Sequence, residues 1–212
     1  DSSYGENNLS EFDLMKEQGI KIYKDGYWIS AFFGNAIKPF SGTGGGTYVL
    51  KEGRLIETPL FYSWDSAAVA LQFPFSYSGD GNMFSQEGVI QTGKYKQEMA
   101  KEAYKRIMPT TPLKNKQLEG VWFLKSTIWD NANPFEQPTE QIKIYAYPRF
   151  AWAQFNPVTK QFIGAGGGTY QFDGTRLTET IEYFTYDIAI GTSFAIDAVS
   201  YTHLTLPTNR EV

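Results

Sequence analysis

Two glycine-rich segments have a composition that can bind phosphate. Residues 42–48 read GTGGGTY and residues 164–170 read GAGGGTY. Consecutive glycines cradle a phosphate when they join a strand to the N-terminus of a helix. Here each run leads into Thr-Tyr and an alternating, strand-like segment, and neither run matches the Walker pattern or G-x-G-x-x-G. We therefore predict structural glycines, which let a strand bend, bulge or approach another backbone closely; they are Gly44, Gly45, Gly46, Gly166, Gly167 and Gly168.

Two glutamates, Glu57 and Glu179, are candidates for acid–base chemistry or for a polar contact with a ligand. Each belongs to an alternating segment in which it shares a mostly apolar face with its neighbours. Such a carboxylate either makes a polar contact in the interior or reaches water at a strand end, because buried ionised groups persist mainly when paired. The two faces are Leu55, Glu57, Pro59, Phe61 and Leu177, Glu179, Ile181, Tyr183.

Aromatic residues near these positions complete the candidate ligand-binding set. Tyr48 and Tyr170 follow the glycines and could stack on a ligand or fill a barrel corner. Trp152 shares a strand face with Phe150, where core packing is the alternative role. The predicted ligand-binding residues are Glu57, Glu179, Tyr48, Tyr170, Trp152 and Tyr183.

The composition excludes several classes of site and partner. The chain of 212 residues has no cysteine and one histidine, His203, so thiolate nucleophiles and Cys-type zinc sites are excluded. Its net charge of -4 and scattered basic residues argue against nucleic acid as a partner. No apolar run reaches the length of a membrane span, which is about 18 residues. We predict no catalytic residue, no metal site and no cofactor, and the sequence identifies no protein partner.

An internal repeat organises the chain. Residues 21–65 align with residues 143–187 without a gap at a shift of 122 residues, and 18 of these 45 positions are identical. The glycine runs and both glutamates coincide in this alignment. A period of this length indicates a duplicated small domain rather than a solenoid.

Each copy has the pattern of an antiparallel meander. Short alternating segments are joined by turns, without helical crossovers between them. Residues 94–107 are ambiguous, since their composition favours a helix and their position favours a closing strand. We predict an all-β fold with a first domain over residues 1–107, a linker over 108–117 and a second domain over 118–197.

Both copies are expected to be incomplete. The segment at residues 118–127 precedes the aligned block of the second copy and has no counterpart in the first, and the second copy ends before the hairpin found at residues 83–93. Residues 118–127 could instead close the first barrel. Contacts of this segment with residues 21–23 would favour that alternative, and contacts with residues 142–145 would rule it out. Residues 198–212, which include His203, resemble a translated sequencing adapter and are expected to be non-native, the alternative being an ordinary C-terminal tail.

The motif Gly120-x-Trp122 resembles the G-x-W of lipocalin first strands, whose Trp plugs the closed end of an eight-stranded barrel. Together with KIY, AWAQFNP, GAGGGTY and LTETIEYF, the chain resembles a lipocalin-like domain of unknown function from secreted or envelope proteins of gram-negative gut bacteria. The resemblance implies two tandem antiparallel up-and-down barrels, and it favours a closing strand at residues 102–107. It also implies that a basic residue of the last strand packs on the first-strand Trp. Arg106 is the nearest match in the first copy, which lacks the Trp partner, whereas the second copy has the Trp without the basic residue.

Three functions follow as expectations. The first is a secreted or periplasmic binding module for a small apolar or amphipathic ligand, since an eight-stranded barrel can enclose one. The second is a structural or protein-interaction module of the cell envelope with a solid barrel core. The third is a barrel enzyme with Glu57 or Glu179 as acid or base, which needs a second titratable group in the same pocket.

Overall fold

The chain forms two antiparallel β-sheets. The structure is a computed structural model that describes residues 18–34, 39–90, 92, 98–125, 138–186 and 189–197. Within these ranges there are 13 strands and one short 3-10 helix, η1 (Ser66–Ala68). No helix in this part of the chain is long and apolar enough to span a membrane. The predicted non-native tail and His203 lie outside the described residues.

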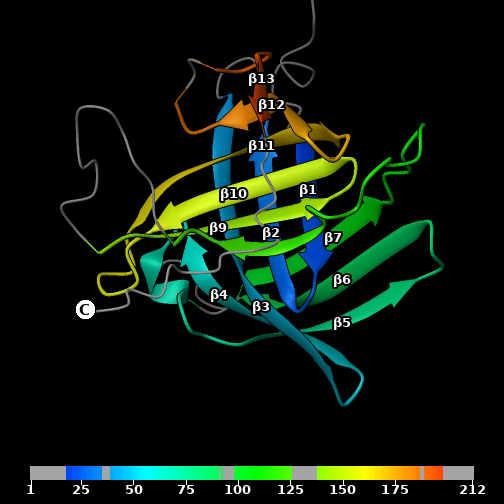
Figure 1. The fold of residues 1–212 in the computed structure, drawn as a ribbon. Helices are drawn as coiled ribbons and strands as arrows, with labels where there is room; N and C mark the ends of the chain where they lie inside the picture. Colours follow the sequence, from blue (N-terminus) through cyan, green and yellow to red (C-terminus); the bar gives the residue numbers. More distant parts are fainter. Residues whose placement is uncertain are drawn as a thin grey trace, which may run out of the picture.

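The first sheet is a nearly closed barrel of seven strands in sequence order (Figure 1). Neighbouring strands pair antiparallel throughout, so the sheet is an up-and-down meander. Its strands are β1 (Gln18–Lys24), β2 (Tyr27–Phe33), β3 (Phe40–Lys51), β4 (Arg54–Tyr62), β5 (Phe73–Gly79), β6 (Met83–Ile90) and β7 (Glu98–Lys105).

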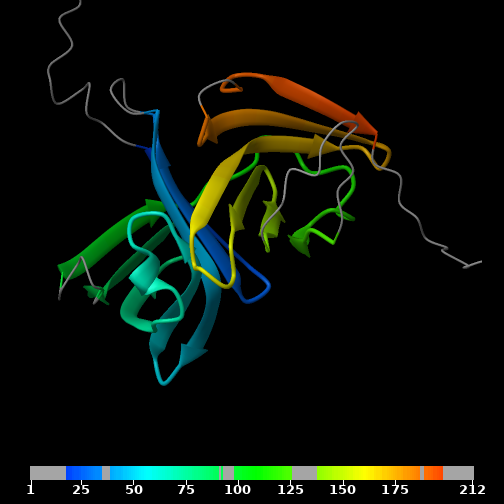
Figure 2. The same cartoon turned by 90° about the vertical axis from the view of Figure 1, so that its left-hand side faces the viewer.

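The second sheet has six strands and does not close (Figure 2). Its order is β13-β12-β11-β10-β9-β8, again a meander. Its strands are β8 (Gly120–Phe123), β9 (Glu140–Ala146), β10 (Arg149–Phe155), β11 (Phe162–Phe172), β12 (Arg176–Phe184) and β13 (Ser193–Asp197).

The structure decides two alternatives that the sequence left open. Within the described part of the segment of ambiguous composition, residues 98–105 form strand β7, which pairs with β6 along its whole length. Strand β8 pairs with β9, with Val121 opposite Ile144 and Phe123 opposite Ile142, and therefore does not close the first barrel. The all-β fold with antiparallel sheets is confirmed; the second copy, expected as a barrel without its last strands, is a sheet that does not close.

The two sheets share one hydrophobic core. Their contact surface includes Ile22 and Ile29 from the first sheet and Ile142 and Ile144 from the second. In Figure 1 the strands of the second sheet run across β1, β2 and β3. Small side chains, among them Ala151, allow the sheets to approach each other closely.

The aromatic contacts between the sheets follow the repeat. Phe33 stacks on Tyr183 at 4.7 Å between ring centroids, and their counterparts Phe155 and Phe61 stack at 5.5 Å. Phe40 stacks on its own counterpart, Phe162, at 6.4 Å. Because each contact has its reciprocal, the two copies meet as in an isologous, approximately two-fold dimer interface.

The glycine runs lie where β3 and β11 pass a bulge in the next strand. The register shifts between Gly45 and Gly46 in β3 and between Gly167 and Gly168 in β11. A Cβ on Gly46 would lie 2.6 Å from the Leu60 backbone nitrogen and closer still to a carbonyl oxygen. The glycines therefore permit backbone-to-backbone contact at a bend of the strand, and no phosphate loop forms.

Candidate functional site

A buried ion pair lies inside the first barrel. The Lys21 Nζ lies 2.9 Å from Glu57 Oε1 and 3.0 Å from Glu102 Oε2. The Tyr23 hydroxyl donates a hydrogen bond to Glu57 and lies 2.8 Å from Gln86 Oε1. The Lys21 and Glu57 side chains are 4% and 3% exposed, so this polar cluster is part of the barrel interior.

The second sheet repeats the same three residues. The Lys143 Nζ lies 2.7 Å from Glu179 Oε1, and the Tyr145 hydroxyl donates to the same carboxylate. Here the Lys143 side chain is 23% exposed, because no counterparts of β6 and β7 cover this face within the described residues. The two sheets thus hold the same lysine, tyrosine and glutamate at different depths.

The strand pattern explains how these side chains meet. Lysine and tyrosine are two residues apart on β1 and on β9, so they share a face. The glutamates lie opposite Tyr48 and Tyr170 in the next strand pair. Each of these tyrosines packs edge-on against the tyrosine of the cluster, at 4.9 Å between centroids in both copies. The repeated K-I-Y could have identified the lysine and tyrosine, whose role the sequence analysis missed.

The tyrosine of each cluster stays protonated and cannot act as a base. Burial, followed by the charge of the adjacent glutamate, raises the pKa of Tyr23 and of Tyr145 well above the usual range. Both therefore stay neutral phenols that donate to a carboxylate. Each glutamate is in turn satisfied by an ammonium group and a phenol, an arrangement that stabilises the interior.

Two predicted site residues, Tyr183 and Trp122, lie apart from the clusters, whereas Trp152 lies directly opposite Lys143 in the β9–β10 pair. Ile181 packs in the same core cluster as Leu177, but the bulge in β12 turns Tyr183 to the opposite face, against Phe33 of the first sheet. The prediction that Tyr183 shares a strand face with Leu177, Glu179 and Ile181 is therefore wrong. Trp152 packs against Phe184 at 5.7 Å. Trp122 is 48% exposed and does not plug a barrel end.

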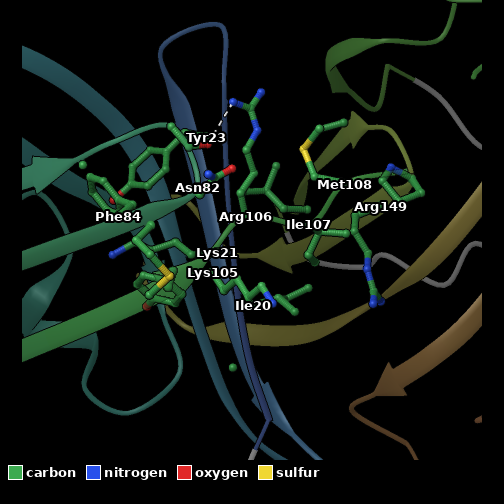
Figure 3. A pocket seen from close by; sticks show the side chains of 18 of the residues that line it. Ile20, Lys21, Tyr23, Asn82, Phe84, Lys105, Arg106, Ile107, Met108 and Arg149 are labelled. Carbon is green, nitrogen blue, oxygen red and sulfur yellow. Dashed lines mark hydrogen bonds between the residues drawn. The ribbon is translucent and has the colours of Figure 1, made fainter. Parts of the chain in front are cut away.

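Arg106 directly follows β7, and its Nη1 donates to the Gly81 carbonyl at 3.4 Å. It forms part of a groove of about 870 Å³ between β1 and β7, which we call the seam groove (Figure 3). The groove is lined by residues 19–23, 79, 81–84, 103–109 and 146–149. Figure 3 shows Tyr23 and Phe84 on one side of β1, and Met108 and Arg149 on the other.

The seam groove is basic although the chain is acidic. Its lining residues include four cations and, among the described residues, no aspartate or glutamate. Lys21 and Arg149 are paired with carboxylates behind the lining. Lys105 and Arg106 form no ion pair with another described residue. The apolar wall of the groove includes Ile20, Ile22, Met83, Ile107 and Met108.

A second polar node, Glu119, joins the two sheets. Its carboxylate accepts hydrogen bonds from the Tyr170 hydroxyl and the Tyr147 backbone N–H, and it lies 3.1 Å from Lys24 of β1. Burial raises the pKa of Glu119, but these hydrogen bonds and the Lys24 charge together outweigh burial and hold the pKa below its usual value of 4.5. Ionised Glu119 therefore stabilises the folded chain.

We predict that Glu119→Gln lowers the free energy of unfolding by about 1–2 kcal/mol at neutral pH. Because the pKa is lower in the folded state, this stabilisation is present above the unfolded-state pKa of 4.5 and is lost as the pH falls through the folded-state pKa. Urea unfolding of both chains at neutral and acid pH measures the difference, which should shrink in acid. Glu140→Gln, which removes an exposed carboxylate of β9, is the control; a deficit independent of pH would contradict the prediction.

Comparisons with protein-family models, curated proteins and solved structures give no match for this chain. Among the described residues there is no group of three or more Asp, Glu or His side chains that could hold a metal ion. The site must therefore be interpreted from its own geometry.

Proposed function

We propose that the chain is a lipocalin-type binding module, exported from the cell, whose ligand is small and amphipathic and occupies the seam groove. The observation that carries this proposal is the combination, in one groove of about 870 Å³, of an apolar wall and two cations that no described carboxylate pairs with. Ligand pockets of this kind are mostly apolar, with a few polar groups that fix orientation.

The barrel interior supports the groove rather than providing the ligand site itself. Leu55, Phe73 and Phe75 are buried there together, and Tyr23 and Tyr48 pack against them. The Lys21–Glu57 pair lies among these side chains and is satisfied internally. A ligand therefore has more room at the seam, where β1 and β7 are not hydrogen-bonded to each other, than in the filled core.

The basic end of the groove defines the polarity of the ligand. Lys105 and Arg106 follow each other at the end of β7, beside the apolar residues Ile107 and Met108. A ligand with an apolar body and a carboxylate, sulfonate or similar anionic group matches both features.

An anionic dye tests this proposal. We expect 1-anilinonaphthalene-8-sulfonate to bind with increased fluorescence, and Arg106→Glu to weaken its binding about five- to tenfold because one attractive charge becomes repulsive. Arg54→Glu, the same change at an exposed position of the β3–β4 hairpin, should leave binding unchanged. Equal binding by all three chains, or none by the parent chain, would contradict the proposal.

The protein-interaction alternative also has an observation in its favour. Several large apolar side chains of β8 and β13 are at least one-third exposed at the two open edges of the second sheet. Exposed strand edges of this kind pair readily with other strands. These residues are Trp122, Phe123, Phe194 and Ile196.

A further inference from the structure

An apolar stripe crosses the outer face of the first sheet, and we infer that it docks the protein on an anionic lipid membrane. The stripe consists of Val49, Ile56, Pro74, Val89 and Met99. None of these residues lines the seam groove, so the docking surface is separate from the proposed ligand site.

The strand register places the five residues in one line. Val49 lies opposite Ile56 in the β3–β4 pair, and Ile56 lies opposite Pro74 in the β4–β5 pair. The β5–β6 register brings Pro74 level with Val89, one position beyond the last pair of that ladder. Val89 lies opposite Met99 in the β6–β7 pair. The stripe therefore follows one level across five neighbouring strands.

The stripe points away from the barrel interior. Its neighbours along the strands, such as Leu55 and Phe75, belong to the buried core, and alternate residues of a strand face opposite sides. Val49, Val89 and Met99 are 54%, 41% and 55% exposed, and the other two residues are exposed or half-buried. Single exposed apolar residues are ordinary, whereas a contiguous apolar patch marks an interaction surface.

A basic row lies beside the stripe on the same face. Two residues along the strands from the stripe, Lys51 lies opposite Arg54, and Lys101 lies opposite Glu87. Three of these four charged side chains are cations, and the row stays basic when Glu52 of the adjoining turn is included, although the whole chain is acidic. An anionic membrane matches this pattern, because apolar side chains enter the acyl boundary while neighbouring lysine and arginine reach lipid phosphates.

The second copy shows that the fold does not require the stripe. At the same level, its outer face carries polar or small residues, which are Gln171, Thr178 and Ala195. In the row beside them, Arg176 lies between two carboxylates, Asp173 and Asp197. The two copies share their strand pattern but differ in polarity and charge at this surface, so the stripe has a role specific to the first copy.

The shape of the molecule favours a lipid surface over a second copy of the chain. In both Figure 1 and Figure 2 the β3–β4 hairpin, which carries Val49, projects beyond the other strands. Leu50, next to the stripe in this hairpin, is 62% exposed. A planar membrane can therefore reach this end of the stripe before it meets the second sheet. The outer face of a barrel is convex, so two such faces would touch over a small area, whereas a lipid surface can deform around one.

Vesicle binding tests the docking surface. We expect the full chain to co-sediment with mixed vesicles of phosphatidylcholine and phosphatidylglycerol, and more weakly with phosphatidylcholine alone. The double variant Val49→Gln, Ile56→Thr carries the residues of the second copy, which the same strand pattern accepts, and should weaken binding about tenfold because two apolar contacts are lost. Lys51→Asp, also the residue of the second copy, should weaken binding to the mixed vesicles about tenfold and leave binding to phosphatidylcholine unchanged.

Two controls restrict the effect to the stripe. Val158→Gln removes an apolar side chain that is 75% exposed in the β10–β11 turn, and it should bind like the parent chain. Arg106→Glu reverses a charge in the seam groove and should also leave vesicle binding unchanged. Because the chain has no cysteine, Val49→Cys and Val158→Cys each accept one environment-sensitive nitrobenzoxadiazole label. Its fluorescence should rise on vesicle addition at position 49 and not at position 158.

Several results would overturn the docking surface. These are no binding to the mixed vesicles, equal loss of binding in Lys51→Asp and Arg106→Glu, or an equal fluorescence response at both labelled positions. A dimer in sedimentation velocity that Val49→Gln, Ile56→Thr dissociates would instead identify a second chain as the occupant. Binding of dye without binding of vesicles would overturn the docking surface and leave the proposed function intact, and the reverse result would overturn only the proposed function.

Discussion

Replacing Gly168 by alanine is expected to destabilise the protein by about 3 kcal/mol or more, which corresponds to a loss of roughly 6–12 °C in Tm for a chain of this size. A Cβ at this position would overlap the Thr180 carbonyl oxygen and lie 2.9 Å from the Glu182 backbone nitrogen. Both atoms belong to the backbone of β12 at its bulge, so no side-chain rotation relieves the contact. Thermal unfolding followed by far-UV circular dichroism measures the change.

Gly164→Ala is the matched control in the same strand. Its Cβ would have no neighbour closer than 3.8 Å, so the variant should melt within about 2 °C of the parent chain. Gly46→Ala should behave like Gly168→Ala, because it meets the backbone of β4 at the corresponding bulge. If Gly168→Ala and Gly164→Ala have the same Tm, the close approach of β11 and β12 does not explain the glycine at position 168.

The internal repeat made the order of strands and turns in both copies predictable from the sequence. The alignment that pairs Glu57 with Glu179 also placed the strands and turns of both copies in one pattern, and alternation within each segment identified antiparallel strands. Closure was less predictable. How far a sheet curls depends on strand number and edge pairing, which local alternation does not encode.

The candidate site was predictable only in part. Alternation indicated that Glu57 and Glu179 lie on mostly apolar faces, and the structure places both inside their sheets. Their partners lie 36 residues earlier in the chain, a pairing that no local pattern specifies. Tyr183 was assigned to the wrong face because a single bulge residue reverses the alternation that follows it.

The seam groove could not have been identified from periodicity. It is formed by residues of β1, β6, β7, the segment after β7 and the β9–β10 turn. Arg106 was expected from the resemblance only as a structural residue whose Trp partner is missing, and its place in the groove lining had no signal in the sequence. Residues 146–149 of the second sheet also line this groove of the first sheet, so its shape depends on how the two sheets pack, and that packing follows the aromatic contacts between the copies.

Replacing Lys21 by methionine is expected to lower the free energy of unfolding by about 3–5 kcal/mol. The change keeps an unbranched side chain one atom shorter and removes the ammonium group that holds Glu57 and Glu102 together. Two carboxylates would then face each other without a cation between them, and Glu57 is almost fully buried. The resulting fall in Tm, about 6–20 °C, exceeds the effect of any exposed ion pair.

Two comparisons make this result specific to the buried cluster. Lys101→Met removes the exposed contact with Glu87, in which both side chains are about half exposed or more, and should cost less than about 1 kcal/mol. The triple variant Lys21→Met, Glu57→Gln, Glu102→Gln should recover most of the lost stability, because neutral amides need no counter-ion. If the triple variant melts as low as Lys21→Met alone, loss of lysine packing rather than unpaired charge explains the deficit. If Lys21→Met has the same Tm as Lys101→Met, the buried cluster contributes no net stability to the barrel.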